Sequence, residues 1–369
     1  MNSRIYDLPM SDIVNVLASV GALNTVLVKG NMGTGKSSLL KELGKRFPHH
    51  KLVYFDCTTK DVGDIGLPSF QTIDGNGVSR FVPNEELGIH LGKDVIVMID
   101  ELGKAPPGVK LAMNRFMLER EIFSYKLTDA SIVFATTNKS GEGLGDILPA
   151  HTRNRLAVVT MRNHTVEEWL AWGLMNNIHP AVLRFVSDTP AVFHTFEDIP
   201  NPRDAQGNLT NPYVFHPGAP MEAFCTPRSL HAASDFCWAR DSIGDAALTA
   251  LLIGTIGDRA ALDLMTYIKL ISDMPTTDDI KRDPVNARVP SSPAAAYMVV
   301  YRTLGSLAPD WGAQWMTYIL RMDAELQQYF FRSAMAQVKD KGPCAFSVML
   351  PQFREWALKN NFAFQSDKV

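Results

Sequence analysis

The chain has 369 residues, of which 46% are apolar and 20% charged, and this length and composition suit two or three domains with buried cores. Its 36 Lys and Arg against 39 Asp and Glu give a net charge of −3, which argues against tight non-specific binding to duplex nucleic acid. The longest apolar run, 246–257, is too short to cross a bilayer. No basic and apolar leader opens the chain, so we expect a cytoplasmic protein. The four cysteines are scattered, which predicts buried thiols rather than disulfides or a zinc site.

Short apolar runs alternate with helical stretches in the first half of the chain. Because these runs are apolar throughout, they predict a parallel sheet of five strands with helices on both faces. The predicted strands are 25–28, 52–55, 95–99, 132–135 and 157–160. A helix is predicted from Lys36 to Phe47, where Pro48 stops it. Residues 70–82 alternate loosely around Asp74-Gly-Asn-Gly77, which predicts a β-hairpin with positive φ at the two central positions.

The pattern becomes helical from Thr165 onward. Thr165 and Glu168 predict a capping box, and Thr226-Pro227 predicts a second helix start. Further helices are predicted over 245–273, 293–304, 313–338 and 351–360. We therefore expect three parts: an α/β nucleotide-binding domain over 1–163, an all-helical lid over 164–285 and a C-terminal helical extension over 286–369.

A polar segment with several Pro and Gly residues, 189–224, separates two helical regions. A loop of that length is typically functional or mobile. Aromatic residues punctuate it: Phe193, Phe196, Tyr213, Phe215 and Phe224. Exposed aromatic residues are enriched in interfaces, so one interpretation is that they dock a partner. The other, with at least equal weight, is that they hold the loop against its own domain.

Residues 30–37, Gly-Asn-Met-Gly-Thr-Gly-Lys-Ser, fit the phosphate-binding pattern G-x-x-x-x-G-K-[ST]. They follow a predicted strand and open a predicted helix, where glycines let successive amides converge on phosphates and the helix N-terminus adds positive potential. Lys36 is expected to reach the β- and γ-phosphates, and the Ser37 hydroxyl to ligate Mg²⁺. The predicted nucleotide-binding residues are Gly30, Asn31, Met32, Gly33, Thr34, Gly35, Lys36, Ser37 and Ser38.

The third predicted strand leads directly into two carboxylates, Asp100 and Glu101. Such a strand end lies at the carboxyl edge of a parallel sheet, where ligands bind in these folds. We expect Asp100 to hold Mg²⁺ through water, together with Ser37, and Glu101 to polarise the attacking water. Asn138, which ends the fourth predicted strand, is placed to orient that water; an ordinary turn asparagine is the alternative.

Three arginines are candidates for stabilising negative charge in the transition state. Arg153 and Arg155 come just before the fifth predicted strand, and an arginine of this kind is worth about 10³–10⁵ in rate and can come from a neighbouring subunit. Arg228 lies in the first turn of a predicted helix, where the helix dipole disfavours a cation. The alternative for all three is an exposed structural arginine.

In this order, the motifs resemble those of an AAA+ ATPase and, more narrowly, of the MoxR group, over roughly residues 10–285. Residues 30–37 resemble the Walker A motif and 95–101 the Walker B motif. Asn138 matches the sensor 1 position, Arg155 the arginine finger with Arg153 as an additional candidate, and Arg228 sensor 2. Members of the group usually have Pro where Met32 stands and Asn-Arg-like residues where Gly103-Lys104 stand.

The resemblance implies a homo-oligomeric ring, expected to be a hexamer, that binds ATP and Mg²⁺ at its subunit interfaces. It implies an enzyme that hydrolyses ATP to remodel or activate a partner protein, a chaperone-like motor whose partner often carries a von Willebrand A-type domain. The hairpin at 70–82 falls where this group carries an insert that typically faces a central pore.

Two other functions fit parts of the sequence. The first alternative is a nucleic-acid-directed AAA+ motor or clamp loader, against which the mild acidity and the lack of a basic stripe weigh. The aromatic residues at 311–331 recur at helical spacing, which predicts core packing rather than base stacking. The second alternative is a P-loop kinase, which does not need both the Asp100-Glu101 pair and Asn138.

Overall fold

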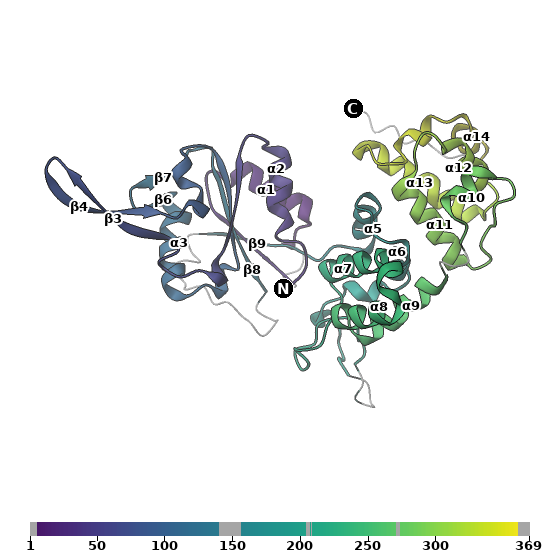
Figure 1. Cartoon of the computed structure of the whole chain (residues 1–369), viewed down its shortest axis with the longest axis horizontal. Coiled ribbons are helices and arrows are strands. Elements are labelled where there is room, and N and C mark those ends of the chain that lie inside the picture. The colour runs from purple at the N-terminus through teal and green to yellow at the C-terminus, as the bar shows by residue number, and fades with distance from the viewer. Residues whose placement is uncertain (1–5, 140–155, 204–206, 208, 271–273, 361–369) are drawn as a thin grey trace. The chain divides into compact units, whose positions relative to one another are not determined.

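The computed structural model describes residues 6–139, 156–203, 207, 209–270 and 274–360 of the chain. The chain divides into two compact units, Met1–His164 and Thr165–Val369, which are coloured purple to teal and teal to yellow in Figure 1.

The first unit contains a five-stranded parallel sheet with the strand order β2-β5-β8-β1-β9. Its strands are β1 (Val26–Gly30), β2 (Lys51–Asp56), β5 (Val95–Asp100), β8 (Ile132–Asn138) and β9 (Ala157–Thr160). The register pairs Gly30 with Asn138 and Asp56 with Asp100, so the polar ends of four strands lie along one edge of the sheet. The predicted fold class, a parallel sheet followed by a helical region, is confirmed.

Helices cover both faces of this sheet (Figure 1). They are α1 (Met10–Val20), α2 (Ser38–Arg46) and α3 (Pro107–Glu119). Successive side chains of a strand point to opposite faces, and in β5 Ile96 and Met98 pack with α1 and α2, whereas Val97 and Ile99 pack with α3. Every residue of β5 is buried, which explains why the strand is apolar up to its last residue, Asp100.

An antiparallel hairpin extends from the first unit, formed by β3 (Gly66–Ile73) and β4 (Asn76–Pro83) (Figure 1). The hairpin was predicted, but it is longer, and its turn lies one residue earlier than expected. Ile73 pairs with Asn76, so positive φ falls on Asp74 (52°) and Gly75 (80°). A second pair, β6 (Glu121–Ile122) and β7 (Tyr125–Lys126), escaped prediction because two residues carry no periodicity.

The second unit is helical. Its helices are α5 (Val166–Met175), α6 (Pro180–Asp188), α7 (Pro227–Trp238), α8 (Arg240–Ile256), α9 (Asp258–Leu270), α10 (Thr277–Arg282), α11 (Pro293–Ser306), α12 (Gly312–Ile319), α13 (Ala324–Asp340) and α14 (Pro351–Lys359). The predicted helix 245–273 is two helices, because Gly257 between them takes φ 86°. The predicted helix 313–338 is likewise divided into α12 and α13. The capping boxes at Thr165 and Thr226 are present.

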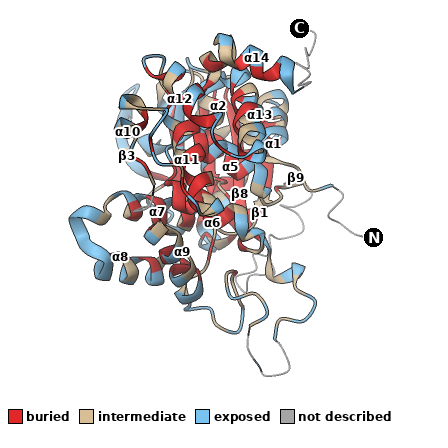
Figure 2. Ribbon diagram, turned by 90° about the vertical axis from the view of Figure 1, so that its right-hand side faces the viewer, coloured by how far each residue is buried: buried red, intermediate tan, exposed pale blue. Residues whose placement is uncertain are grey.

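One hydrophobic core runs through this unit, from Trp169 in α5 to Ala357 in α14, and Figure 2 shows its buried positions in red. The predicted aromatic core is confirmed, since Trp315, Phe330 and Phe331 are fully buried. Phe331 also stacks on Trp356, with 3.8 Å between ring centroids. This core continues from α5–α9 into α11–α14. The predicted boundary at residue 285, between a helical lid and a C-terminal extension, stays a prediction.

Aromatic residues of the segment 189–224 contact their own unit. Phe193 is buried in the core, and Tyr213 packs against the same core. The Tyr213 hydroxyl also donates a hydrogen bond of 2.8 Å to Asp263. Phe215 and Phe224 contact each other edge-to-face at 5.2 Å. These contacts favour the interpretation that the aromatic residues hold the loop in place.

No helix in the described part of the chain is long and apolar enough to span a membrane. The four cysteines are buried and form no disulfide, as the sequence predicted.

His179 is a buried histidine at the start of α6 in the second unit. Its Nδ1 accepts a hydrogen bond of 3.2 Å from the Ala181 amide at the start of α6, and its ring meets Trp238 edge-to-face. Burial, with a smaller contribution from the charge of Arg240, lowers the pKa of His179 to about 4. The neutral ring is therefore the form that the fold accommodates.

We expect the second unit to lose stability as the pH falls from about 6.5, the ordinary pKa of histidine, toward 4. Because the unfolded chain takes up the proton first, the loss attributable to His179 is about 2–3 kcal/mol at pH 4.5. All six tryptophans lie in the second unit, so tryptophan fluorescence during urea unfolding monitors that unit alone. The variant His179→Asn keeps a helix-capping side chain but cannot titrate, and its unfolding midpoint is expected to depend less on pH. An equal pH dependence in both proteins would contradict this assignment.

Candidate functional site

The loop between β1 and α2 has the conformation that a phosphate cradle needs. β1 ends at Gly30 and α2 begins at Ser38, with Ser37 as the residue before the helix. Gly33 and Gly35 take φ of 70° and 90°, which residues with a side chain rarely adopt. Successive N–H groups can thus turn inward ahead of the positive end of a helix. The helix begins two residues later than predicted, because residues 36 and 37 belong to this loop.

The Lys36 side chain is buried under the loop. Its ammonium donates hydrogen bonds to the carbonyl oxygens of Gly30 (2.9 Å) and Asn31 (2.8 Å) and to Oδ1 of Asn138 (2.7 Å). Thr34 closes the loop from within, since its hydroxyl donates to the Asn31 carbonyl at 2.9 Å. The ammonium is therefore held at the mouth of the loop, at the edge where the strands end.

Asp100, the last residue of β5, is buried between the two neighbouring strands. The hydroxyl of Thr136 on β8 donates a hydrogen bond to its Oδ1, and the hydroxyl of Tyr54 on β2 donates one of 2.8 Å to its Oδ2. The Glu101 amide also donates to Oδ1, at 3.1 Å. The carboxylate is thus fixed in one orientation.

Glu101 follows directly in the left-handed region, with φ 52°. A residue other than glycine or asparagine rarely takes this conformation, and such strain is typical of functional sites. It turns the Glu101 carboxylate toward Asn138, whose amide nitrogen donates to Oε1 at 3.0 Å and to Oε2 at 3.2 Å. Lys104 forms an ion pair with Oε2 at 3.1 Å.

Asn138 connects the two motifs. β8 lies between β1 and β5 in the sheet, so its last residue is next to both the phosphate loop and the carboxylate pair. Its carbonyl oxygen accepts from Lys36, and its amide nitrogen donates to Glu101. One side chain thus joins the lysine of the loop to the second carboxylate.

The residues present fit a magnesium nucleotide. Mg²⁺ prefers oxygen ligands and is usually bound through one or two carboxylates, water and substrate phosphates, and Ser37 and Asp100 offer a hydroxyl and a carboxylate. The φ values of Gly33 and Gly35 provide the open backbone that phosphates need. The nearby thiol of Cys57 is no competing nucleophile, because burial and the charges of Asp56 and Asp100 raise its pKa to about 12.

The three predicted arginines stay untested, because none of them lies among the described residues of the first unit. Arg153 and Arg155 lie outside the described residues. Arg228 is exposed in the first turn of α7, in the second unit. Asn31, Met32 and Ser38 lie in or directly after the loop, as predicted, and Asn31 also donates to Asn163 at 3.2 Å.

Four residues around the site were not identified from the sequence: Tyr54, Thr136, Lys104 and His164. Thr136 and Tyr54 hold Asp100, Lys104 pairs with Glu101, and a ring nitrogen of His164 lies 3.0 Å from the Thr34 carbonyl oxygen. Thr136 sits two residues before Asn138 on the same strand, which is the one signal that could have predicted it. Tyr54 and His164 come from distant segments with no motif of their own, and Lys104, three residues after Glu101, carries no sequence signal of its contact.

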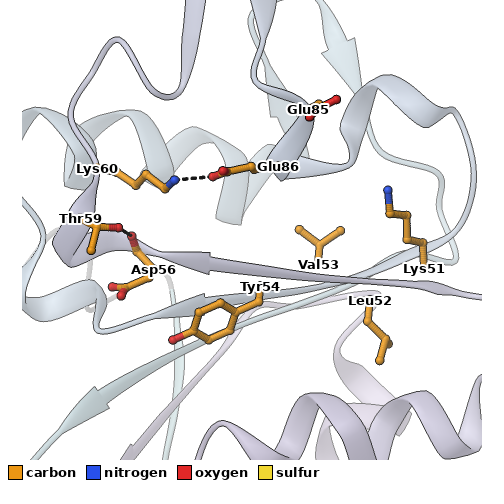
Figure 3. Close-up of a pocket in the computed structure, with 9 residues that line it drawn as sticks. All are labelled: Lys51, Leu52, Val53, Tyr54, Asp56, Thr59, Lys60, Glu85 and Glu86. Carbon is orange, nitrogen blue, oxygen red and sulfur yellow. Dashed lines mark hydrogen bonds and ion pairs between the residues drawn. The ribbon is translucent and has the colours of Figure 1, made fainter.

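A separate open pocket of about 420 Å³ runs along β2, the edge strand of the sheet (Figure 3). It is lined by Lys51, Leu52, Val53, Tyr54, Asp56, Thr59, Lys60, Glu85 and Glu86. None of these residues belongs to the phosphate loop. Tyr54 is shared, because it lines the pocket and its hydroxyl contacts Asp100.

A loop with the phosphate-binding pattern after β1, a carboxylate pair after β5 and an amide at the end of β8 thus lie at one edge of a five-stranded parallel sheet. No family model and no curated protein matches the sequence. Solved structures with a related chain path include the RuvB Holliday junction branch migration motor of Thermotoga maritima, with 14% identity over 74% of this chain and 72% of that chain and a TM-score of 0.36.

Two point mutants of the same Thermotoga maritima RuvB protein also match, each with a TM-score of 0.36. The mutant with arginine in place of a lysine has 14% identity over 76% of this chain and 73% of its own. The mutant with glycine in place of a proline has 15% identity over 74% of this chain and 77% of its own. Because identity and TM-score are this low, the function has to be argued from the residues of this chain.

Proposed function

We propose that this chain is an AAA+ ATPase that binds magnesium-ATP at the phosphate loop and hydrolyses it. The observation that carries the proposal is the contact of Asn138 with both Lys36 (2.7 Å) and Glu101 (3.0 Å). The Asn138 side chain thereby bridges a lysine placed to bind phosphate and a carboxylate suited to activate water. A water that attacks a terminal phosphate needs both a group that binds the phosphate and a group that activates the water close to it.

Each residue has a separate role in the proposed reaction. The loop amides and Lys36 bind the β- and γ-phosphates, and Ser37 and Asp100 hold the metal, which supplies positive charge to the phosphate oxygens. Glu101 polarises the attacking water, and Asn138 orients that water. When phosphates bind Lys36, its ammonium gives up its hydrogen bonds to the loop and to Asn138. The Oδ1 of Asn138 is then available to orient the water.

The direct test of the proposal is binding and turnover by the full chain. We expect a fluorescent ATP analogue to bind, and phosphate to be released only when both ATP and Mg²⁺ are present. Absence of binding would remove the proposed function. The same assay with DNA or RNA added distinguishes a protein-directed motor from a nucleic-acid motor, for which strong stimulation is expected.

We propose further that the chain works as a homo-oligomeric ring, a hexamer of the MoxR type. The ring remodels or activates a partner protein, and a protein with a von Willebrand A-type domain is a candidate partner. The net charge of −3 supports a protein partner over nucleic acid. The exposed hairpin β3–β4 also supports it, because Leu67 and Phe70 are 65% and 85% exposed and offer an apolar surface.

The ring can be tested through the arginine finger. Arg155→Ala is expected to reduce hydrolysis about 10³-fold or more, with little change in ATP affinity. Mixing this variant with Lys36→Ala, which keeps its arginines but cannot bind ATP, should restore part of the activity, because one subunit then supplies the arginine and its neighbour the phosphates. Arg153→Ala is the comparison, and the variant that is rescued identifies the finger. Failure of both to be rescued would contradict an arginine supplied by a neighbour.

A further inference from the structure

The carboxylate of Asp100 is held from both sides by residues of neighbouring strands. Thr136 on β8 and the Glu101 amide donate to Oδ1, and Tyr54 on β2 donates to Oδ2 at 2.8 Å. An ionised carboxylate accepts about four hydrogen bonds, two on each oxygen. Among the contacts of the described residues, Oδ1 accepts two and Oδ2 accepts one. The position left for a metal-bound water is therefore on Oδ2, the oxygen that Tyr54 holds.

We propose that Tyr54 is a positioning residue for magnesium. The hydroxyl of Tyr54 orients the Asp100 carboxylate so that its Oδ2 faces the metal. This inference rests on the proposed function, because it assumes that Asp100 holds the metal of a bound nucleotide. Groups that hydrogen-bond a metal-binding carboxylate orient it and tune its affinity for the metal. Tyr54 acts through Asp100 and touches no reacting atom.

The surroundings of Tyr54 suit this role. Leu52 and Tyr54 point to one side of β2 and Val53 to the other (Figure 3). Tyr54 is 49% exposed on this edge strand. The ring contributes little to the core, whereas its hydroxyl reaches a carboxylate that is only 7% exposed. The substitution Tyr54→Phe removes the hydrogen bond to Asp100 and keeps the ring.

The test compares the affinity for ADP in Mg²⁺ and in EDTA, measured by calorimetry on the full chain. We expect wild type to bind ADP more tightly in Mg²⁺ than in EDTA. In Tyr54→Phe, the affinity in EDTA should stay within about twofold, and the enhancement by Mg²⁺ should fall about tenfold. In an Asp100→Asn background, Tyr54→Phe should cause no further loss, because the carboxylate that it orients is gone.

The matched control is Tyr213→Phe, which removes another tyrosine–aspartate hydrogen bond of 2.8 Å, to Asp263 in the second unit, and should leave both affinities unchanged. An unchanged Mg²⁺ enhancement in Tyr54→Phe, or an equal loss in Mg²⁺ and in EDTA, would overturn the positioning role while leaving the ATPase proposal standing. If wild type binds ADP equally in Mg²⁺ and EDTA, the role of Tyr54 is overturned as well. If wild type binds no adenine nucleotide at all, both proposals fail.

Discussion

Replacing Glu101 with glutamine is expected to stop ATP hydrolysis while ATP stays bound. Glutamine has nearly the same shape, so Asn138 can still donate to its side-chain oxygen, but an amide cannot accept a proton from water. Loss of a general base typically costs about 10²–10⁴ in rate, and we expect a decrease of about 10³ in single-turnover phosphate release. The ATP-bound protein should also survive gel filtration with its nucleotide intact.

The control for this variant is Glu119→Gln at the end of α3. Glu119 is exposed and pairs with Arg115 four residues before it, so it lies on the surface of the same unit. Its substitution should leave hydrolysis unchanged. If Glu101→Gln hydrolysed ATP at the wild-type rate, the left-handed Glu101 and its contacts with Asn138 and Lys104 would be structural, and another group would have to activate water.

Replacing Lys36 with alanine is expected to abolish nucleotide binding rather than slow the chemistry. The ammonium is buried and lies where the phosphates are proposed to bind, and removing one partner of a buried charge pair costs about 2–5 kcal/mol. We therefore expect the affinity for ATP to fall at least about 30-fold in a titration with a fluorescent analogue. At ATP concentrations that saturate the wild-type protein, the variant should show no hydrolysis.

Lys45→Ala is the matched control, since Lys45 lies near the end of α2 and pairs with Glu42 at the surface. It should bind ATP as wild type does. Lys36 also donates to Asn138, so the fold of Lys36→Ala has to be checked by thermal unfolding. A folded Lys36→Ala protein with unchanged ATP affinity would refute the assignment of residues 30–37 as a phosphate site.

The parts of the candidate site differ in how well the sequence alone could predict them. The loop at 30–37 could be predicted because its conformation is local: glycines at 33 and 35 allow positive φ, and the strand before and the helix after it fix its direction. Asp100, Glu101 and Asn138 could be placed at the same edge because parallel strands end on the same side of a sheet. Neither argument needs a contact between distant segments.

The contacts that join these residues could not be predicted in the same way. That Asn138 meets both Lys36 and Glu101 follows from the position of β8 between β1 and β5, and strand order is a property of the assembled sheet. Tyr54 reaches Asp100 because β2 pairs with β5 in a particular register. A shift of that register by one residue would turn Tyr54 to the other face.

The sequence by itself determined that this chain has a phosphate loop, a strand ending in two carboxylates and a helical second half, because each depends on local backbone preferences and on the spacing of apolar residues. Only the tertiary structure decided which side chains hold Asp100 and Glu101 and that Lys36 is engaged by Asn138. The physical reason is that these hydrogen bonds link residues 36 to 102 positions apart, and packing of the sheet brings them together.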